Sequence, residues 1–486
     1  MKKKSLIFII LAVIAVVVII GAIVLINSTT SNNSGKKSKS AKINGTVELL
    51  KEYETTGGQD VLDDRAVNTS RYIYEISNNQ ESYIDKNGNI IATGRHDKLY
   101  PIYPLGDDYF VEIDKYKTLT VRKNNKDIYT DKIDNSVVYR DDVIYYSYTE
   151  NSQSYAVAYN LKQGKILWKV LGEHPFILDN DYVVIDKYDN KTTNVVNKKD
   201  GKSILKNINE GETIYVSQAG YFKITKNREI ETYDFNNNKL STTPIKEKGV
   251  ISKLSNGGFI ISESDNSKFT VYNNKGKVIL EAEGSVIGFN TYTQEINGIM
   301  TKGFGTSDYS VVKSNRASGK NYLVYNDGTV IEFSPSTSID NDSGFGHYDV
   351  NTTPRFIVSS YGDNYSDTMI IDAKTKKSKV LGIKMKNQLK YHENGEYIIL
   401  EKAGIEKHFY VYNSEFEKVY ESDNSLWVLN DSWFIDAPTT SAIKTKFVNA
   451  STLEEKEIDL DGVFDFNNET NIVTREFGKQ HLYAIK

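Results

Sequence analysis

The segment "DNDSGFGHYD", residues 340–349, holds the best candidates for metal chemistry in this sequence. Asp340 and Asp342 stand at alternate positions before Gly344 in a polar loop, which matches the start of a calcium-binding loop. The acidic residue that completes such a loop is absent at the expected spacing. A turn rich in Asp and Gly for backbone reasons therefore fits the segment better, and Asp340 and Asp342 remain weak metal candidates.

No other pattern has the spacing of a catalytic site. The six histidines form no H-E-x-x-H pair, and the doublets Asp107-Asp108 and Asp141-Asp142 each precede a predicted strand, as turn residues do. The two "GFG" segments lack the strand-to-helix setting of a phosphate loop. The chain has no Cys, which excludes disulfides, thiol catalysis and cysteine-bound zinc. The sequence therefore predicts no catalytic residue and no cofactor.

Two long segments are candidates for binding instead. They are "FNTYTQEINGIMTKGFGTSDYSVVKSNRASG" (289–319) and "SPSTSIDNDSGFGHYDVNTTPR" (334–355). Extra loop length on a repeat scaffold is where recognition usually resides. Their candidate contact groups are Tyr292, Phe304, Tyr309, Phe345, His347 and Tyr348. Extra hairpin strands without a binding role are an equally open interpretation.

The elements that would position these loops form a repeat. The chain returns to one pattern, in which an apolar strand ends near Tyr-Asn or Ile-Asp and a turn of Asn, Lys and Gly leads into a second strand. Successive copies are separated by 38, 37, 37, 37 and 39 residues, and then by 53, 46, 41 and 36. The aligned positions are Asp85, Lys123, Asn160, Asn197, Asp234, Asn273, Asn326, Asp372, Asn413 and Asn449. Periods of this size indicate units that each bury a face against the next.

One unit can be interpreted strand by strand in residues 250–283. The segments "VISKLS", "GFIISES", "KFTVYNN" and "KVILEAE" predict four short strands, separated by turns rich in Gly, Asn and Asp. Four antiparallel strands in about 37 residues are typical of a propeller blade. The sequence therefore predicts an all-β chain, a β-propeller of four-stranded antiparallel blades behind an N-terminal transmembrane helix.

The copy "AYNLKQGKILWKV", with Asn160, Gly164 and Trp168, resembles the repeat of the quinoprotein-dehydrogenase-like propellers. The copy "YIDKNGNIIAT" (83–93) is similar to WG-type repeats. The resemblance covers roughly residues 70–486 and implies a propeller fold, although Leu205 and Leu280 replace the Trp in other copies. That family's cofactor pocket uses a tryptophan platform, metal-ligating carboxylates and often adjacent cysteines. With three Trp and no Cys, the chain is predicted to use Trp168 for packing between blades.

The two ends of the chain are predicted to meet. The last residues, "HLYAIK", look like the third strand of a unit that lacks its fourth, and "TVELLKEY" (46–53) is the candidate to complete it. Such pairing removes exposed strand edges. The count is then about ten or eleven units, above the usual four to eight. Incomplete units, one large ring and two tandem rings all remain open.

The N-terminus predicts a membrane anchor. Residues 6–26 are 21 residues without a charge, or about 31 Å of helix, which is enough to cross a bilayer core. The polar "NSTTSNNS" that follows does not look like a signal-peptide cleavage site. Lys2, Lys3 and Lys4 favour a cytoplasmic N-terminus, although four lysines between positions 36 and 42 count against it.

The predicted organisation is a basic segment (1–5), a transmembrane anchor (6–26), a flexible polar stalk (27–42) and a propeller domain (43–486). The predicted location is the cell membrane, single-pass, with the C-terminal domain extracytoplasmic. A net charge of −4 with mixed signs gives no nucleic-acid footprint. The leading hypothesis is a non-enzymatic binding or scaffold module for a protein or a cell-envelope polysaccharide. The alternative is an envelope hydrolase or lyase with carboxylates gathered at one mouth of the ring.

Overall fold

The computed structural model describes residues 46–55, 61–63, 73–77, 80–94, 102–106, 109–134, 137–178, 181–186, 193–205, 212–245, 249–265, 267–284, 286–289, 293–296, 299–303, 308–314, 320–333, 337–339, 355–360, 369–381, 385–391, 397–402, 408–430, 432–439, 444–468 and 470–486. Residues 45–486 form one compact unit. Every element in the described ranges is a β-strand, and none of these ranges contains a helix that could span a membrane. The anchor and stalk predicted at 6–26 and 27–42 lie outside the described residues.

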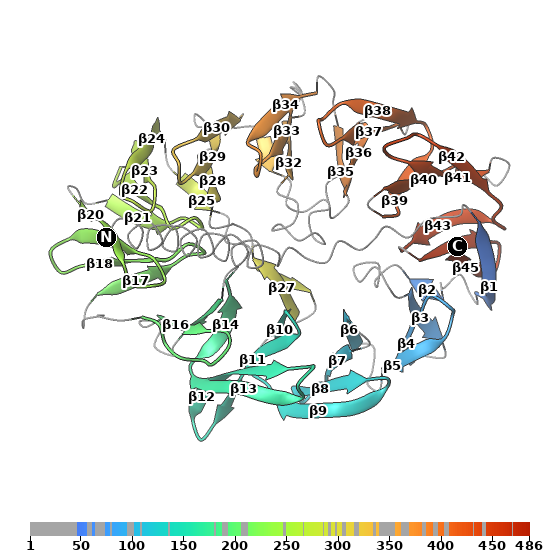
Figure 1. Cartoon of the computed structure of the whole chain (residues 1–486), viewed down its shortest axis with the longest axis horizontal. Coiled ribbons are helices and arrows are strands. Elements are labelled where there is room, and N and C mark those ends of the chain that lie inside the picture. Colours follow the sequence, from blue (N-terminus) through green and yellow to red (C-terminus); the bar gives the residue numbers. More distant parts are fainter. Residues whose placement is uncertain are drawn as a thin grey trace, which may run out of the picture. The chain divides into compact units, whose positions relative to one another are not determined.

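The described strands form eleven sheets, of which nine have four strands (Figure 1). The first five sheets along the chain are β2 (Leu62–Asp63), β3 (Ile73–Ser77), β4 (Gln80–Ile84) and β5 (Ile90–Thr93); β6 (Ile102–Gly106), β7 (Tyr109–Ile113), β8 (Thr118–Lys123) and β9 (Lys126–Lys132); β10 (Val137–Arg140), β11 (Val143–Glu150), β12 (Gln153–Asn160) and β13 (Lys165–Leu171); β14 (Glu173–Ile177), β15 (Tyr182–Asp186) and β16 (Thr193–Asn197); and β17 (Thr213–Val216), β18 (Tyr221–Ile224), β19 (Glu229–Tyr233) and β20 (Lys239–Pro244).

The next five sheets are β21 (Gly249–Lys253), β22 (Phe259–Glu263), β23 (Lys268–Tyr272) and β24 (Val278–Glu283); β25 (Val286–Phe289), β28 (Tyr309–Ser314), β29 (Asn321–Tyr325) and β30 (Val330–Phe333); β31 (Thr337–Ile339), β32 (Arg355–Ser360), β33 (Met369–Asp372) and β34 (Lys377–Val380); β35 (Met385–Tyr391), β36 (Tyr397–Lys402), β37 (Phe409–Asn413) and β38 (Lys418–Ser422); and β39 (Ser425–Val428), β40 (Trp433–Ala437), β41 (Thr445–Asn449) and β42 (Glu455–Ile458). Within each of these sheets neighbouring strands are antiparallel.

The last sheet joins the two ends of the described chain. It contains β43 (Val463–Asn467), β44 (Asn471–Glu476) and β45 (Lys479–Ile485), and its fourth strand is β1 (Val47–Glu54). β1 is antiparallel to β45, from Val47 opposite Ile485 to Glu54 opposite Lys479. The predicted pairing of residues 46–53 with the C-terminal strand is therefore confirmed.

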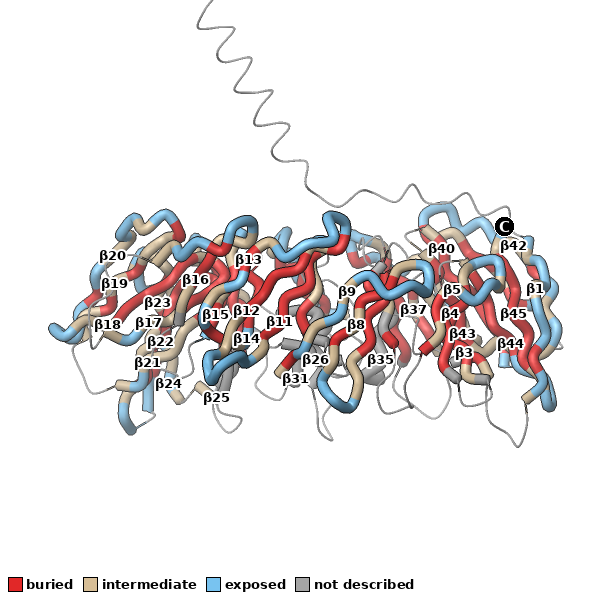
Figure 2. Tube along the Cα trace, turned by 90° about the horizontal axis from the view of Figure 1, so that it is seen from below, coloured by how far each residue is buried: buried red, intermediate tan, exposed pale blue. Residues whose placement is uncertain are grey.

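Each sheet is covered on both faces, which explains why the inner strands are largely buried. In β7, four of the five side chains are buried, whereas β9, at the edge of the same sheet, has the pattern of exposed and half-buried residues of a solvated strand. In Figure 2, exposed residues lie mainly in the turns, and the interiors of the strands are buried. The composition rich in Val, Ile and Tyr suits these twice-covered strands.

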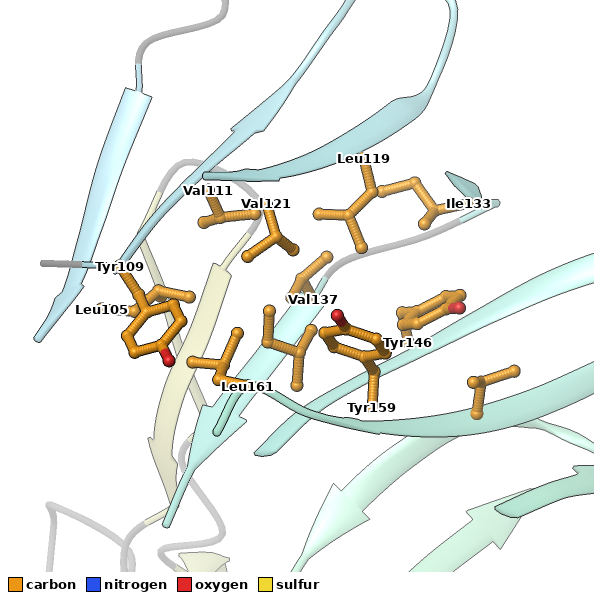
Figure 3. Close-up of a cluster of buried hydrophobic side chains, with 12 residues drawn as sticks. Leu105, Tyr109, Val111, Leu119, Val121, Ile133, Val137, Tyr146, Tyr159 and Leu161 are labelled. Atoms are coloured by element: carbon orange, nitrogen blue, oxygen red, sulfur yellow. The ribbon is translucent and has the colours of Figure 1, made fainter. Parts of the chain in front are cut away.

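Buried apolar clusters lie between successive sheets throughout the unit. Figure 3 shows the cluster between the β6–β9 and β10–β13 sheets, where Val111 and Leu119 face Val137 and Tyr159. Where the last two sheets meet, the rings of Trp427 and Phe464 lie 5.3 Å apart. The β1–β45 sheet also packs on the β2–β5 sheet through one shared cluster. Contacts between neighbours therefore run through all eleven described sheets and return to the first.

The turn between the third and fourth strands explains the repeated polar residue. Oδ1 of Asn273 accepts hydrogen bonds from the backbone N–H groups of Lys275 and Lys277, both at 3.0 Å. Oδ1 of Asp85 does the same two and four residues ahead, at 2.9 Å. Asn and Asp favour such turns because a short side-chain acceptor replaces a backbone acceptor. The recurring Asn or Asp is thus a turn-capping residue.

Two aligned positions differ from this rule. Lys123 has no capping oxygen, and its turn instead places Asn124 and Asn125 at φ 47° and 59°, a conformation that Asn tolerates. The second exception is Asn326, where the alignment of the repeats is wrong by one residue. The N–H of Tyr325 donates to Thr329 O at 3.0 Å, as that of Asp85 donates to Asn89 O, so Tyr325 rather than Asn326 holds the equivalent position.

Candidate interaction surface

The structure places one of the predicted contact residues in the core. Tyr309 begins β28 and is only 3% exposed, and its ring lies 5.8 Å from that of Tyr325 in a buried cluster. It is therefore a packing residue of its sheet and not an exposed contact group. The other contact candidates, Tyr292, Phe304, Phe345, His347 and Tyr348, and the metal candidates Asp340 and Asp342 lie outside the described residues.

The described part of the first long segment forms a hairpin that joins a distant sheet. β26 (Thr293–Ile296) and β27 (Ile299–Gly303) are antiparallel to one another. β27 also runs parallel to β10, with Val137 opposite Ile299 and Val138 opposite Met300. The β10–β13 sheet thereby becomes six-stranded, and this pairing is visible in Figure 1. Extra hairpin strands, one of the two interpretations left open by the sequence, are what this segment contains.

The opposite part of the same sheet is extended by long strands. β11 and β12 have eight residues each and remain paired as far as the turn that joins them, where Glu150 lies opposite Gln153. The tight turn between them has Asn151 and Ser152 at φ 52° and 63°, which suits the twist of a two-residue hairpin. The corresponding strands β22 and β23 have five residues each. The end of β11–β13 therefore extends further than the corresponding end of the β21–β24 sheet.

This extended end carries a cross-strand aromatic row. We call Tyr148, Glu150, Tyr155, Lys169 and Leu171 the overhang. Tyr155 is opposite Tyr148 on one side and Leu171 on the other, and the two Tyr rings are 6.0 Å apart. Nζ of Lys169 lies 4.0 Å from the centre of the Tyr155 ring and 2.9 Å from Glu150. Leu171 is 54% exposed, so the row offers aromatic and apolar area to solvent.

Local electrostatics fix the rings in place. Hydrogen bonds with Tyr148 and then Glu150 raise the pKa of Lys169, so this side chain stays charged over the two rings. At the base of the overhang, the hydroxyl of Tyr146 donates to Asp131 of β9 at 2.5 Å, and that of Tyr129 donates to the same carboxylate at 2.8 Å. Burial, followed by the bond to Asp131, raises the pKa of Tyr146. The overhang is therefore attached to a rigid base.

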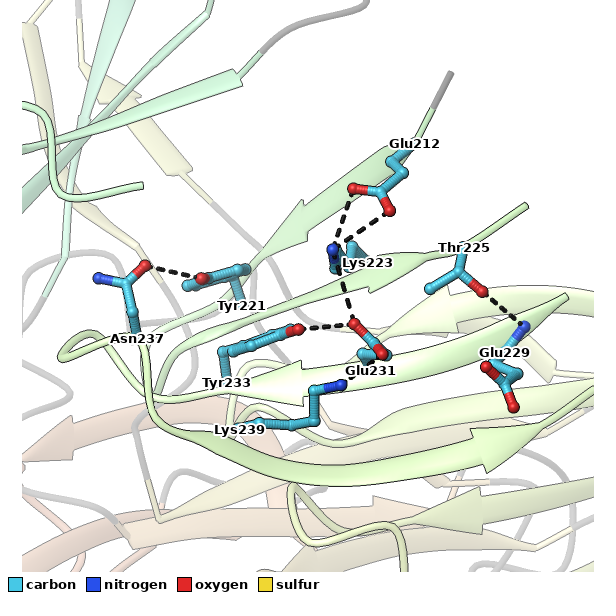
Figure 4. Close-up of polar contacts among 9 residues, drawn as sticks. All are labelled: Glu212, Tyr221, Lys223, Thr225, Glu229, Glu231, Tyr233, Asn237 and Lys239. Atoms are coloured by element: carbon cyan, nitrogen blue, oxygen red, sulfur yellow. Dashed lines mark hydrogen bonds and ion pairs between the residues drawn. The ribbon is translucent and has the colours of Figure 1, made fainter. Parts of the chain in front are cut away.

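The buried charges of other sheets form ion pairs with structural roles. Arg122 is fully buried, and its guanidinium lies 2.8 Å from Glu112 and donates to Thr93 O of the preceding sheet at 2.6 Å. In Figure 4, Lys223 lies between Glu212 at 3.0 Å and Glu231 at 3.5 Å. Pairing offsets the cost of burying these charges, so they fix sheet geometry.

Glu231 shows how such a carboxylate is kept ionised. Burial opposes ionisation, but hydrogen bonds from Lys239 and Tyr233 outweigh it and lower the pKa of Glu231. Within the described ranges, no group of three or more His, Asp or Glu side chains could hold a metal ion. The chemistry that these residues support is structural pairing and surface contact.

The sequence contains a local signal for the overhang, around the turn at residues 150–153. Residues 143–160 form one run of strand-forming residues that is broken only by "ENSQ", whereas the corresponding segment of the β21–β24 unit contains the longer polar turn "ESDNSK". Tyr146, Tyr148 and Tyr155 would have been assigned to one face by the alternation of a hairpin. The spacing between capping residues does not reveal this extension, because longer strands joined by a shorter turn give the same unit length.

No family model matches this chain, and no curated protein sequence matches it. Solved structures with a similar chain trace include a eukaryotic initiation factor, with a TM-score of 0.40, 10% identity, and coverage of 72% of this chain and 95% of that chain. BamB from Moraxella catarrhalis gives 0.27 and 11%, with 80% and 98% covered. The C-terminal WD40 domain of Sif2 gives 0.26 and 10%, with 91% and 99% covered.

The assignment of fold rests on the strand pairing and packing described above. Repeated four-stranded antiparallel sheets, packed face to face in chain order, define the β-propeller class. This protein is a β-propeller, and the predicted all-β repeat is confirmed.

Proposed function

We propose that this protein is a non-enzymatic β-propeller that binds a protein partner through the overhang. The observation that carries the proposal is the row formed by the half-buried Tyr148 and Tyr155 and the exposed Leu171 on the extended end of β11–β13. Tyrosine side chains are enriched where proteins recognise one another, because they supply large contact area at low cost in conformational entropy. Lys169 and Glu150 hold the rings before a partner arrives, which lowers that cost further.

The alternative, an envelope hydrolase or lyase, needs carboxylates that converge. The buried acidic side chains in the described ranges are Glu75, Glu81, Glu112, Asp372, Glu401 and Asp436. They lie on the second or third strands of five different sheets, and only Glu75 and Glu81 share one. These strands lie inside their sheets, and no three of these described carboxylates come together as a group. This distribution favours the binding hypothesis over the enzymatic one.

We also propose that the eleven sheets are the blades of a single ring and that the domain is extracytoplasmic. The ring is supported by the succession of contacts that returns through β1 and β45.

The membrane attachment is supported by the 21 uncharged residues at 6–26, and the orientation by Lys2, Lys3 and Lys4. Alkaline carbonate extraction of cell membranes tests the anchor, and deletion of residues 6–26 is expected to release the protein. Protease digestion of intact cells tests the orientation.

Site-specific photo-crosslinking tests the binding surface in the full-length protein. A photoreactive amino acid replaces Leu171 in one variant and, as a control, Val380 of β34 in another, because these side chains are similarly exposed at 54% and 49%. A discrete crosslinked protein is expected from position 171 alone. It is expected to disappear when Tyr148→Ser and Tyr155→Ser are added. Equal crosslinking at both positions, or no effect of the serine substitutions, would contradict the assignment.

A further inference from the structure

The turns between third and fourth strands lie side by side along one rim of successive sheets. Nδ2 of Asn273 in one such turn donates to Asn326 O in the next turn at 2.9 Å. Lys376 and Asp327 form an ion pair between the two turns that follow, and Lys377 lies 2.7 Å from Glu415 in the turn beyond. Turns from consecutive sheets are therefore direct neighbours, and we call this series the turn rim.

The same succession holds earlier in the chain, where each turn contacts the last strand of the sheet before it. The amide of Thr93 on β5 donates to Asn125 Oδ1 at 3.3 Å, and Trp168 Nε1 on β13 donates to Lys198 O at 2.8 Å. A Cβ on Gly276 would come within 2.7 Å of Thr243 on β20. The turn rim thus continues from the β6–β9 sheet to the β21–β24 sheet.

Charge is distributed very unevenly along the turn rim. Five consecutive turns, at residues 123–127, 160–165, 197–202, 234–239 and 273–277, contain ten Lys, three Asp, and no Arg or Glu, a net charge of +7. We call these five turns the basic arc. Two turns of the rim near the C-terminus, at 413–418 and 449–455, contain four Glu and one Lys. The whole chain has a net charge of −4, so the positive charge is concentrated at one place.

The acidic residues within the basic arc are already engaged. Asp127 pairs with the buried Arg122, Asp200 with Lys202, and Asp234 accepts two backbone N–H groups of its own turn. Several lysines, by contrast, are exposed and make no ion pair with any described residue. They are Lys126, Lys165, Lys199, Lys275 and Lys277. The basic arc therefore presents uncompensated positive charge to solvent.

We propose that the basic arc binds a linear polyanion, a soluble polymer that carries a phosphate or carboxylate group in each repeat. Four of the five sheets supply one or two unpaired lysines each, and this row of positive charges matches repeated charges along a flexible chain. Lysine is a mobile point charge, whereas arginine imposes a fixed bidentate geometry, so an arc with lysine alone suits a polymer recognised by charge and spacing. The binding free energy then comes largely from the release of counterions.

The composition of these turns favours a soluble polymer over a membrane surface. Binding to a bilayer interface usually adds exposed apolar side chains that insert among the lipids. The large apolar residues of the basic arc are Leu161 and Phe235, and they are only 2% and 9% exposed. The basic arc is also distinct from the overhang, because Lys165 and Leu171 are at opposite ends of β13. The proposal therefore does not depend on the protein partner proposed above.

Charge reversal in the full-length protein tests the proposal, with inorganic polyphosphate as the probe. The arc variant is Lys165→Glu, Lys199→Glu and Lys275→Glu. The matched control is Lys115→Glu, Lys226→Glu and Lys268→Glu, which reverses three exposed lysines in or beside the turns between second and third strands. Both variants change the net charge equally, and their melting temperatures are compared first. Arc substitutions to Gln provide a second variant if reversal destabilises the fold.

The wild-type protein is expected to bind polyphosphate with an affinity that falls as salt rises. The arc variant is expected to lose at least about tenfold in affinity and to reduce the slope of log K against log salt by about 2, since three contacts are removed. The control is expected to lose less than about twofold. Equal losses of affinity in both variants would show that binding depends only on the net charge of the protein, and this would overturn the assignment to the basic arc. Binding of anionic lipid vesicles without binding of polyphosphate would overturn it in favour of a membrane surface.

Discussion

The β10–β13 and β21–β24 sheets share one repeat and differ at its margins. In both, the register of the third and fourth strands shifts at the same place, between Ala158 and Tyr159 and between Val271 and Tyr272, and an Asn caps the turn that follows. Only the first has eight-residue strands, the added β26–β27 hairpin and a buried tryptophan. The comparison teaches that the bulge and the capped turn are the constant features of a sheet that packs against its neighbours. The length of the strands and the addition of further strands can vary without changing these features.

The largest difference in stability between the two sheets is expected when the residue that follows the bulge in the fourth strand is truncated. Trp168 lies opposite Ala158, is 6% exposed and donates to the neighbouring sheet, whereas Leu280 lies opposite Val271 and is half-buried. Trp168→Ala is expected to lower the free energy of unfolding by about 3–5 kcal/mol and Leu280→Ala by about 1–2 kcal/mol. Urea unfolding measures both. Equal losses would show that the tryptophan is not a special contact between sheets.

The second difference concerns the asparagine caps of the turns. Here the larger loss of stability is expected in the β21–β24 sheet. Asn273 accepts two backbone hydrogen bonds and donates one to the next sheet, whereas Asn160 accepts one from Gln163 at 2.7 Å. At about 1 kcal/mol for each bond, Asn273→Ala is expected to cost about 2–3 kcal/mol and Asn160→Ala about 1 kcal/mol. Asp substitutions, which keep the acceptor, serve as controls in the same unfolding experiment. A greater cost at Asn160 would contradict this account of the turn.

A smaller effect is expected when the added hairpin is removed. β27 pairs with β10 through two residue pairs, so replacing residues 293–303 with a short Gly-Ser linker should cost about 1 kcal/mol. Hydrogen exchange is expected to accelerate in β10 and to remain unchanged in β21, which has no added partner. This result would show that the hairpin in the first long segment contributes to the stability of the sheet. Unchanged exchange in β10 would show that the pairing contributes nothing.

The smallest effect is a difference in alkaline stability. Burial raises the pKa of Tyr145 and Tyr146, and that of Tyr272, above the ordinary value of 10.0. A raised folded-state pKa means that the protonated phenols stabilise the fold fully below about pH 10, and this contribution is lost as the pH rises further. Unfolding free energies should therefore fall above pH 10. The fall should be smaller in Tyr145→Phe than in Tyr272→Phe, as urea unfolding at several pH values can measure. Identical profiles would count against a larger contribution from the β10–β13 sheet.

The sequence by itself determined the repeating unit and where the ends of the chain meet. Alternation, capped turns and hairpin residues are local signals, because each depends on neighbours within a few positions. They predicted four-stranded sheets, the turn of Asn273 and the pairing of β1 with β45. One misalignment, Asn326 for Tyr325, arose because "YNDGT" offers two polar residues beside the turn and only the hydrogen bonds select the register.

Tertiary structure alone decided which residues became available at the surface. Tyr309 had been assigned to a contact loop, and its burial depends on a β-strand register and on packing against the next sheet. The parallel pairing of β27 with β10 joins segments far apart in sequence, and no local period encodes it. The overhang exists because β11 and β12 extend further than neighbouring hairpins, a relation between sheets. Packing between segments far apart in the sequence determines which strands extend beyond their neighbours. The sequence of one unit contains only one of the two residues in each such contact.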